Sequence, residues 1–395
     1  MLDLVDLNEL RCLVENLVLS AQVLQEAIDR NYITGRLSSI LSEYYEIGEL
    51  VNVRRLDRGY VNVSYEIETL KGGKRNRYFL RRYKRGIREE EVKFEHSIIK
   101  HLMTKSFSLS AGLIKRKDGL SYVKTVEMTQ GEGEEAYFAV FQYLHGEDKY
   151  TWDNPVCSDT ELEDSARVLA QYHSTVYDLK PEGRRYEPRI VELLPTISGN
   201  LMKYAKRTGS TKFDAYFLKN LDYILTVVDR TLGQIKKAEY DKLPHLAIHC
   251  DFHPGNLKYK DSRAVGLFDF DWSKIDSRCF DVGLAITYFC STWEGKEDGD
   301  LLLDKMVLFL LTYEEELKRI QGIGPLQEKE IEYLPVMVKA SNLYVLNWDV
   351  DDYYIKKPNP YEYLIYLQHN VRFMRWLENN WNNFVYTVKK TFREI

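Results

Sequence analysis

Three polar residues in one segment of the chain could act together on a phosphate group: Asp251, Asn256 and Asp269. Carboxylate and amide oxygens are hard ligands, suited to a magnesium ion that also binds phosphate oxygens. Asn256 and Asp269 are therefore candidate magnesium ligands. Asp251 lies just upstream, where it could orient a hydroxyl group for attack on that phosphate.

The sequence around these residues predicts a hairpin that brings two of them together. The expected elements, in order, are a buried strand or turn entry at Leu246–Ile248, a turn at Pro254-Gly255, a strand from Leu257, a turn at Asp261–Arg263 and a returning strand at Ala264–Phe268. Asn256 begins this hairpin and Asp269 ends it. We therefore expect the two side chains to lie close together.

The same segment resembles the catalytic core of kinases. The residues that carry the resemblance are His249-Cys250-Asp251, Asn256, Asp269-Phe270 and Asp281-Val282-Gly283-Leu284. Protein kinases have Arg where this chain has Cys250, and Gly where it has Asp271. This variant is similar to the aminoglycoside phosphotransferase family, which also holds choline, homoserine and methylthioribose kinases. Each residue alone is also typical of a turn or a strand end, but the ordered set favours the family.

The resemblance implies a role for each polar residue of this segment. Asp251 is the predicted catalytic residue, which orients the acceptor hydroxyl and accepts its proton. Asn256 and Asp269 are the predicted ligands of Mg²⁺, which accompanies ATP. Asp281 is expected to brace the catalytic loop through hydrogen bonds. For Asp271 two interpretations stay open, a ligand of a second metal ion and a solvated or capping aspartate.

Five residues further towards the N-terminus are candidates for the nucleotide site. Gly59 and Asn62 lie in a predicted strand–turn–strand that resembles the family's nucleotide-covering loop, although one Gly in a hairpin is also an ordinary turn. Arg81 takes the position of the family's phosphate-binding cation, with a solvated strand edge as the alternative. Glu95, on the following helix, is expected to pair with it. Tyr143 begins the segment that resembles the linker holding the adenine.

The acceptor side of the site is predicted from a run of carboxylates beside aromatic rings, Asn347–Tyr354. Trp348 and Asp349 are the candidate substrate-binding residues, because such a run suits an amine-bearing or polyhydroxy molecule. The alternative is a solvated acidic loop with Trp348 in the core. The run contains no Arg for a substrate carboxylate, which counts against homoserine unless an Arg from elsewhere, such as Arg372, reaches in. Amino alcohols and sugars are therefore expected ahead of plain hydroxy acids.

The fold class implied by the resemblance is α+β, a bilobal protein-kinase-like fold. It comprises a small antiparallel-sheet N-lobe and a larger, mainly helical C-lobe. The predicted domains are a helical extension at 1–40, the N-lobe at 41–146 and the C-lobe at 147–395. Within the N-lobe, a strand is also predicted at Ala111–Lys115.

Composition narrows the classes of partner and compartment. The 395 residues carry a net charge of −5, which argues against nucleic acid or an anionic membrane as the main partner. Five cysteines without metal-ligand spacing indicate free thiols in a reducing compartment, so a cytoplasmic location is expected. No apolar run approaches the length of a membrane span. The oligomeric state and the role of residues 1–35 are left open.

These observations predict an ATP-dependent kinase that phosphorylates a hydroxyl of a small metabolite of the homoserine, choline, aminoglycoside or sugar type. The alternative from another class is a catalytically silent kinase-like binding or scaffold protein. Such proteins usually lose the base or a metal ligand, whereas this chain keeps Asp251, Asn256 and Asp269. A protein kinase is a third interpretation, disfavoured because no Ala-Pro-Glu segment follows Asp269.

Overall fold

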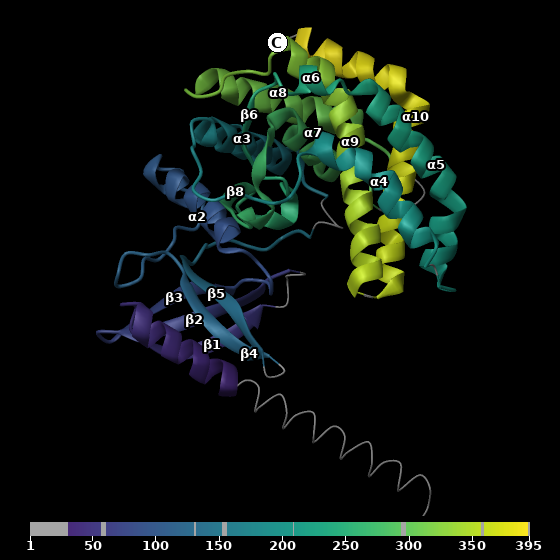
Figure 1. Cartoon of the computed structure of the whole chain (residues 1–395). Coiled ribbons are helices and arrows are strands. Elements are labelled where there is room, and N and C mark those ends of the chain that lie inside the picture. Colours follow the sequence, from purple (N-terminus) through teal and green to yellow (C-terminus); the bar gives the residue numbers. More distant parts are fainter. Residues whose placement is uncertain are drawn as a thin grey trace, which may run out of the picture. The chain divides into compact units, whose positions relative to one another are not determined.

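The computed structural model describes residues 31–56, 61–129, 132–151, 156–207, 209–293, 298–356 and 359–393. The chain divides into two compact units. The first comprises the residues up to Ile87 together with Leu113–Tyr143, and the second comprises Arg88–Gly112 together with the chain from Leu144 onward. Figure 1 shows the strands of the first unit and the helices of the second. No helix among the described residues is both long and apolar enough to cross a membrane.

The first unit is built on a five-stranded antiparallel sheet. Its strands are β1 (Glu49–Leu56), β2 (Val63–Lys71), β3 (Lys74–Arg82), β4 (Val123–Thr129) and β5 (Glu132–Gln142). They lie in the order β1-β2-β3-β5-β4, so β3 is the central strand. Gly72 and Gly73 join β2 to β3 with positive φ at both positions. A two-residue turn of that kind matches the twist of the strands that it connects.

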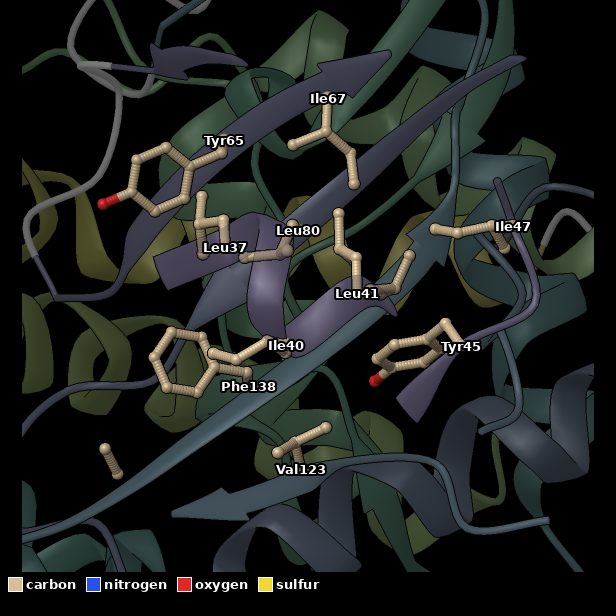
Figure 2. Packing of buried hydrophobic residues seen from close by; sticks show 12 residues of the cluster. Leu37, Ile40, Leu41, Tyr45, Ile47, Tyr65, Ile67, Leu80, Val123 and Phe138 are labelled. Carbon is tan, nitrogen blue, oxygen red and sulfur yellow. The ribbon is translucent and has the colours of Figure 1, made fainter. Parts of the chain in front are cut away.

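A helix formed by residues 31–44 packs against one face of this sheet. Leu37, Ile40 and Leu41 follow the spacing of one helix face and are buried. They belong to a core cluster that also includes Tyr65, Ile67, Leu80, Val123 and Phe138 from the strands (Figure 2). Burial of each such side chain contributes roughly 1.5–3 kcal/mol relative to exposure. Of the predicted helical extension, residues 1–30 lie outside the described residues, while residues 31–40 belong to this core.

The predicted strand at Ala111–Lys115 is wrong. That segment makes one isolated bridge, between Leu113 and Phe141, and Ile114 N–H donates to the carbonyl of Val140 at 2.8 Å. The segment contacts β5 over two residues only, which is too short for a ladder of hydrogen bonds.

The second unit is mainly helical. Its helices are α2 (Glu89–Thr104), α3 (Asp159–Val176), α4 (Ile190–Ala205), α5 (Lys212–Gln234), α6 (Lys237–Tyr240), α7 (Arg278–Phe289), α8 (Leu303–Arg319), α9 (Glu328–Lys356) and α10 (Pro360–Arg393). Two short antiparallel pairs complete it, β6 (His245–Ile248) with β9 (Lys274–Ser277), and β7 (Leu257–Lys260) with β8 (Arg263–Leu267). Both pairs lie within the segment that carries the candidate catalytic residues.

Helix α7 lies at the centre of the second unit, and every one of its residues is buried. It packs closely against α9 at Gly283. A methyl group at that position would come within 3.0 Å of the backbone of Met337 and Val338. Only glycine allows the two helix backbones to approach so closely. This contact fixes α7, and with it Asp281, against the helix that carries the predicted acceptor residues.

Candidate active site

The loop after β6 places Asp251 through two strong constraints on its backbone. Cys250 adopts a left-handed conformation with φ of 62°, which is costly for a residue other than glycine. The buried carboxylate of Asp281 accepts the N–H of His249 at one oxygen and the N–H of Cys250 at the other, each at 2.8 Å. These hydrogen bonds hold the strained loop in place. The bracing role predicted for Asp281 is therefore seen in the structure.

A hydrogen bond from helix α3 also fixes the carboxylate of Asp281. His173 Nε2 lies 3.0 Å from Asp281 Oδ2, and His173 Nδ1 lies 2.8 Å from the hydroxyl of Tyr313. Burial lowers the pKa of His173, although hydrogen bonding to Asp281 opposes the shift. The imidazole is therefore neutral, donates from Nε2 to Asp281 and accepts from Tyr313. His173 is therefore a buried histidine that links Asp281 to Tyr313 by hydrogen bonds.

The hairpin of β7 and β8 brings Asn256 and Asp269 to one place, as predicted. Leu257 pairs with Leu267, and the N–H of Phe268 donates to the carbonyl of Asn256 at 3.2 Å. On its other side, the carbonyl of Phe268 accepts from His249 Nε2 at 3.1 Å. Phe268, the residue before Asp269, is therefore hydrogen-bonded both to the hairpin and to the loop that carries Asp251.

Helix α3 and the segment after Leu144 hold the hairpin from outside. Asp164 on α3 accepts the N–H of Ala264 at 2.7 Å and the guanidinium of Arg263 at 2.9 Å. Glu147 makes two backbone hydrogen bonds with Tyr259, at 2.8 and 3.1 Å. The β7–β8 pair alone would be marginal, because two short strands bury little surface. The contacts with Asp164 and Glu147 therefore stabilise the β7–β8 pair.

The side chain of Asp251 is oriented, ionised and accessible. Asn256 Nδ2 donates at 2.8 Å to both the carbonyl and Oδ2 of Asp251, and His253 Nε2 lies 3.6 Å from Oδ2. Burial raises the pKa of Asp251, but the imidazole of His253 and the other donors more than offset it, so the pKa lies below its usual value. The side chain keeps 24% of its exposure. A reactant hydroxyl can therefore reach a charged oxygen.

The residues present fit a magnesium ion bound together with phosphate. The two hydrogen bonds to Asp251 fix the amide nitrogen of Asn256, which leaves its Oδ1 to face other ligands. Asp269 has φ of 68° and ψ of 62°, a left-handed conformation that Asp tolerates better than most residues. Magnesium usually takes one or two protein carboxylate or amide ligands and completes its shell with phosphate and water. Asp271, which is buried, follows two residues later.

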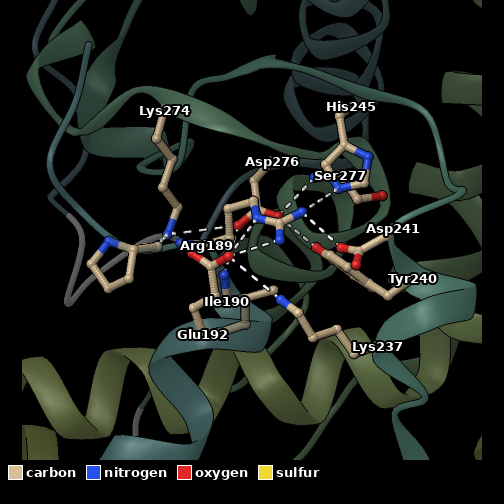
Figure 3. A network of polar contacts seen from close by, with 11 residues as sticks. Arg189, Ile190, Glu192, Lys237, Tyr240, Asp241, His245, Lys274, Asp276 and Ser277 are labelled. Carbon is tan, nitrogen blue, oxygen red and sulfur yellow. Dashed lines mark hydrogen bonds and ion pairs between the residues drawn. The ribbon is translucent and has the colours of Figure 1, made fainter.

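A buried network behind the loop positions β9 and the start of α7 (Figure 3). Asp276 accepts the N–H of Ile190, the first residue of α4, at 2.8 Å and the hydroxyl of Tyr240 at 2.7 Å. A carboxylate at a helix N-terminus satisfies an otherwise unpaired N–H and interacts favourably with the helix dipole. Lys274 donates to the carbonyl of Pro188 at 2.7 Å. The segment at the start of α4 and helix α6 therefore both contact β9, which leads into α7 and Asp281.

In the first unit, the candidate nucleotide residues lie on and beside the central strands. Arg81 on β3 is buried, and its guanidinium carbon lies 5.7 Å from the ring of Phe79 and 5.8 Å from that of Phe141. Asn62 accepts the N–H of Lys84 at 2.9 Å, which ties the start of β2 to the chain just after β3.

The remaining nucleotide-side candidates are placed as follows. The ring of Tyr143 lies 4.2 Å from the guanidinium of Arg77. Gly59 lies outside the described residues. Glu95 belongs to the second unit, where it is buried on α2. Its pairing with Arg81 stays a prediction.

The acidic run at the end of α9 is not a solvated loop. Asp351 accepts the hydroxyl of Tyr204, and Asp352 accepts that of Tyr363 and pairs with Lys356. Asp349 is fully buried, and its Oδ2 accepts from Asn370 Nδ2 at 2.6 Å. The three carboxylates therefore have different surroundings.

The other two candidates on the acceptor side are already packed or paired. Trp348 is half-buried and stacks against Tyr363, with ring centroids 6.4 Å apart. Lys356 lies 6.0 Å from the ring of Trp348. Arg372 pairs with Asp298. Its guanidinium is therefore already neutralised.

Sequence reasoning missed four residues that the structure brings to this region. They are His253, Tyr288, Asn342 and Asn370. The His253-Pro254 pair in the catalytic loop was a local signal that could have been used. The other three lie on helices α7, α9 and α10, and their sequence context is that of ordinary helical residues.

Comparison with known proteins identifies the family. The model of the phosphotransferase enzyme family matches residues 52–305, which include Asp251, Asn256, Asp269 and Asp281. The chain belongs to this family. The predicted enzyme class, a phosphotransferase with an alcohol group as acceptor, is thereby confirmed.

Curated relatives of this phosphotransferase family member include homoserine kinases. That of Parvibaculum lavamentivorans is 25% identical over 331 residues, covering 82% of this chain and 90% of the relative. That of Chelativorans sp. strain BNC1 is 23% identical over 338 residues, covering 81% and 88%. The family is one of small-molecule kinases, and these matches extend over most of both chains.

Solved structures confirm the predicted kinase-like fold class. A microcompartment-associated aminopropanol kinase superposes with a TM-score of 0.64 at 15% identity, covering 89% of this chain and 98% of that one. A spectinomycin phosphotransferase in complex with ADP and spectinomycin gives a TM-score of 0.55 at 15% identity, covering 90% and 98%. At this identity the likeness shows the fold alone.

Proposed function

We propose that this protein transfers the γ-phosphoryl group of Mg-ATP to a hydroxyl of a small amino alcohol, with homoserine and aminopropanol as the first candidates. The observation that carries the proposal is the geometry around Asp251. An ionised, partly exposed carboxylate is held by Asn256, and Asn256 in turn is hydrogen-bonded to the residue before Asp269. A base next to two metal-ligand side chains is the arrangement that phosphoryl transfer requires.

Asp251 orients the acceptor hydroxyl and accepts its proton in this proposal. Its lowered pKa keeps the carboxylate charged at neutral pH, which favours a hydrogen bond from the hydroxyl to Oδ2 or Oδ1. Asn256 Oδ1 and Asp269 would hold Mg²⁺, which neutralises charge on the phosphates when bound. Because the transition state is loose, positioning and charge account for most of the catalysis.

The nucleotide side of the proposal rests on the first unit. Arg81, braced by Glu95, would steady the phosphates of ATP, and Gly59 with Asn62 would cover them. Tyr143 would lie at the adenine. Support for a nucleotide comes from the spectinomycin phosphotransferase complex with ADP and from an amicoumacin kinase complex with AMP-PNP, both of similar fold.

The choice of acceptor follows from the relatives and from the acidic run of α9. The curated relatives act on homoserine by name, and a similar structure is named as an aminopropanol kinase. Both names describe molecules with an amine and a hydroxyl. Trp348 and Asp349 are the proposed acceptor residues on this side of the site. A silent binding protein is disfavoured, because Asp251, Asn256 and Asp269 are all present.

A direct assay tests the proposed function. The purified protein is incubated with Mg-ATP and a set of small alcohols, and new phosphate esters are detected by mass spectrometry. An ester that forms with the wild type, but neither without Mg²⁺ nor with Asp251→Asn, supports the proposal. ATP binding without any ester across amino alcohols, sugars and choline would instead favour a silent binding protein.

A further inference from the structure

The three carboxylates at the end of α9 differ in one respect that bears on ligand binding. Asp351 and Asp352 each accept a tyrosine hydroxyl. Asp349 is fully buried, yet its Oδ1 accepts no hydrogen bond within the part of the chain that the structure describes. A buried carboxylate oxygen without a donor is costly, so the native protein retains it against a penalty of about 1–3 kcal/mol.

A second acceptor without a donor lies on the same face of α9. Asn342 precedes Asp349 by seven residues, which is two helical turns. Its Nδ2 donates to the carbonyl of Asn370 at 2.9 Å, while its Oδ1 is buried and accepts nothing among the described residues. The amide nitrogen of Asn370 is already used, since it donates to Asp349 and to the carbonyl of Tyr366. When Asp349 is ionised, the described residues therefore offer no donor to its Oδ1 or to that of Asn342.

Tyr288 on α7 and Tyr344 on α9 both lie beside the loop that carries Asp251. Burial raises the pKa of the Tyr288 hydroxyl, and the charges of Asp251 and Asp349 raise it further. The ring of Tyr288 is 5.3 Å from that of His253, whose Nε2 is 3.6 Å from Asp251. Helix α9 also contacts the loop directly, since Cys250 Sγ lies 3.8 Å from the hydroxyl of Tyr344, two residues after Asn342.

We propose that Asp349 Oδ1 and Asn342 Oδ1 bind the protonated primary amine of the substrate. This inference rests on the proposed function and narrows its acceptor to primary amino alcohols. A primary ammonium group carries three N–H donors and a positive charge, which matches two buried acceptors of which one is a carboxylate. A quaternary ammonium has no N–H, and an alcohol without an amine leaves both oxygens unsatisfied.

Binding at this subsite changes the protonation of Asp349. Burial raises the pKa of Asp349 well above its usual value, and Asn370 offsets this only in part. The other titratable groups that act on it are Asp352 on the same helix and Tyr288 on α7. An ammonium ion favours the carboxylate form, so its binding releases a proton to solvent. Affinity for the amine should therefore rise with pH.

A comparison of four similar alcohols tests whether the amine, and not another group of the substrate, determines kcat/KM. We would measure kcat/KM for L-homoserine, 3-amino-1-propanol, choline and 4-hydroxybutanoate under saturating Mg-ATP. All four have a primary hydroxyl, but only the first two have a primary ammonium. We expect those two to be phosphorylated, and the other two to be poorer by about 10²-fold or more, the factor for an unsatisfied charged hydrogen bond.

Comparable turnover of choline or 4-hydroxybutanoate would overturn the subsite while leaving the proposed function standing. Turnover of choline or 4-hydroxybutanoate without turnover of either primary amine would also overturn it. No turnover of any of the four alcohols, whether or not Mg-ATP binds, would instead refute the proposed function.

Two further measurements address Asp349 itself. Asp349→Asn should raise KM for 3-amino-1-propanol and lower kcat/KM about 10²-fold, with kcat changed little. The matched control is Asp351→Asn, two residues away, which should stay within about threefold of the wild type because its carboxylate accepts Tyr204. Mg-ATP binding verifies that each variant is folded. Wild-type kcat/KM in Asp349→Asn would contradict the subsite.

The second measurement needs no variant. Calorimetric titration of the wild type with 3-amino-1-propanol, in the presence of a non-hydrolysable ATP analogue, is carried out in two buffers with different enthalpies of ionisation. The apparent enthalpies should differ in the sense of proton release, and affinity should increase between about pH 6 and pH 8. Equal enthalpies with pH-independent affinity would mean that Asp349 does not ionise on binding.

Discussion

The catalytic segment from β6 to α7 and the acidic end of α9 both crowd several carboxylates into a short stretch of chain, but they are organised differently. Asp251 and Asp281 find their main partners within the catalytic segment itself, at Asn256 and in the backbone of His249 and Cys250. The carboxylates of α9 find theirs on other helices, up to 147 residues away in sequence. The carboxylates of the first region are therefore positioned by nearby residues in the chain, and those of the second by the packing of distant helices.

This difference predicts how the two regions respond to substitution. Changes to the exposed or ligand-facing groups of the catalytic segment should remove activity and leave stability nearly intact. Changes to the paired carboxylates of α9 should affect stability and leave activity nearly intact. Asp349 is the exception within its region, because it combines deep burial with an oxygen that lacks a donor.

The largest effect is expected at the base. Asp251→Asn keeps the size and the contact with Asn256 but removes the charge that accepts the proton, so kcat should fall by about 10³-fold. The affinity for Mg-ATP and the melting temperature should change little. Asp261→Asn, in the exposed turn of the same hairpin, is the matched control and should retain activity. A kcat within tenfold of the wild type in Asp251→Asn would contradict the assignment.

The next effect concerns the metal. Asp269→Asn should weaken magnesium-dependent ATP binding by about 10²-fold, because a neutral amide replaces the charged ligand. Asparagine is chosen because it tolerates the left-handed backbone at this position, whereas alanine would add strain. Calorimetric titration with Mg-ATP measures the affinity. Unchanged affinity would place the metal elsewhere, with Asp271 as the first residue to test.

A smaller effect separates Asp349 from its neighbours through the pH dependence of stability. The pKa of Asp349 is raised on folding, so the native state binds a proton that the unfolded state has released. The resulting stabilisation is complete below the unfolded pKa and is lost as pH rises through the folded pKa, by at most about 1.4 kcal/mol per pH unit. Relative to the wild type, Asp349→Asn should therefore gain stability between pH 5 and pH 8.

Urea unfolding at several pH values measures this difference in unfolding free energy. Asp351→Asn, whose carboxylate accepts a tyrosine hydroxyl, serves as the reference. Parallel stability curves for wild type and Asp349→Asn over this range would show that Asp349 is not held protonated. The two outcomes also bear on function, because an aspartate kept at a cost to stability is typical of binding sites.

The smallest effect tests the paired part of α9. Tyr204→Phe removes the hydroxyl that Asp351 accepts but keeps the ring, which stacks on Tyr354 with centroids 4.9 Å apart. We expect a loss of about 1 kcal/mol in unfolding free energy, the usual value of one hydrogen bond, and unchanged kcat/KM. A loss of activity larger than tenfold would show that Asp351 also belongs to the acceptor pocket.

The sequence was sufficient to predict those parts of the site whose residues lie close together in the chain. The hairpin that joins Asn256 to Asp269 could be predicted, because turn residues and alternation mark its strands and its two-residue turn. The brace at Asp281 followed from the family motif. By contrast, the strand at Ala111–Lys115 was wrongly predicted, because a short apolar segment can be buried beside a strand without pairing along its length.

On the acceptor side, the sequence indicated the acidic run of α9 but not the different roles of its three aspartates. In sequence, Asp349, Asp351 and Asp352 are equivalent acidic neighbours. Their roles differ because Tyr204, Tyr363 and Asn370 reach them from other helices. No pattern within one helix encodes such contacts, since they depend on how helices far apart in the chain pack together.

The hairpin also constrains how this segment can vary among related proteins. Asn256 and Asp269 stand at the open end of β7 and β8, and Asp261 and Ser262 close the other end with positive φ. The pair already has one register irregularity, between Lys258 and Tyr259, and a further residue inserted or deleted in one strand would shift Asp269 relative to Asn256. Matched changes in both strands, or extra residues at the exposed turn, would preserve the pair. Length variation in this family should therefore concentrate at the tip, or occur in compensating pairs.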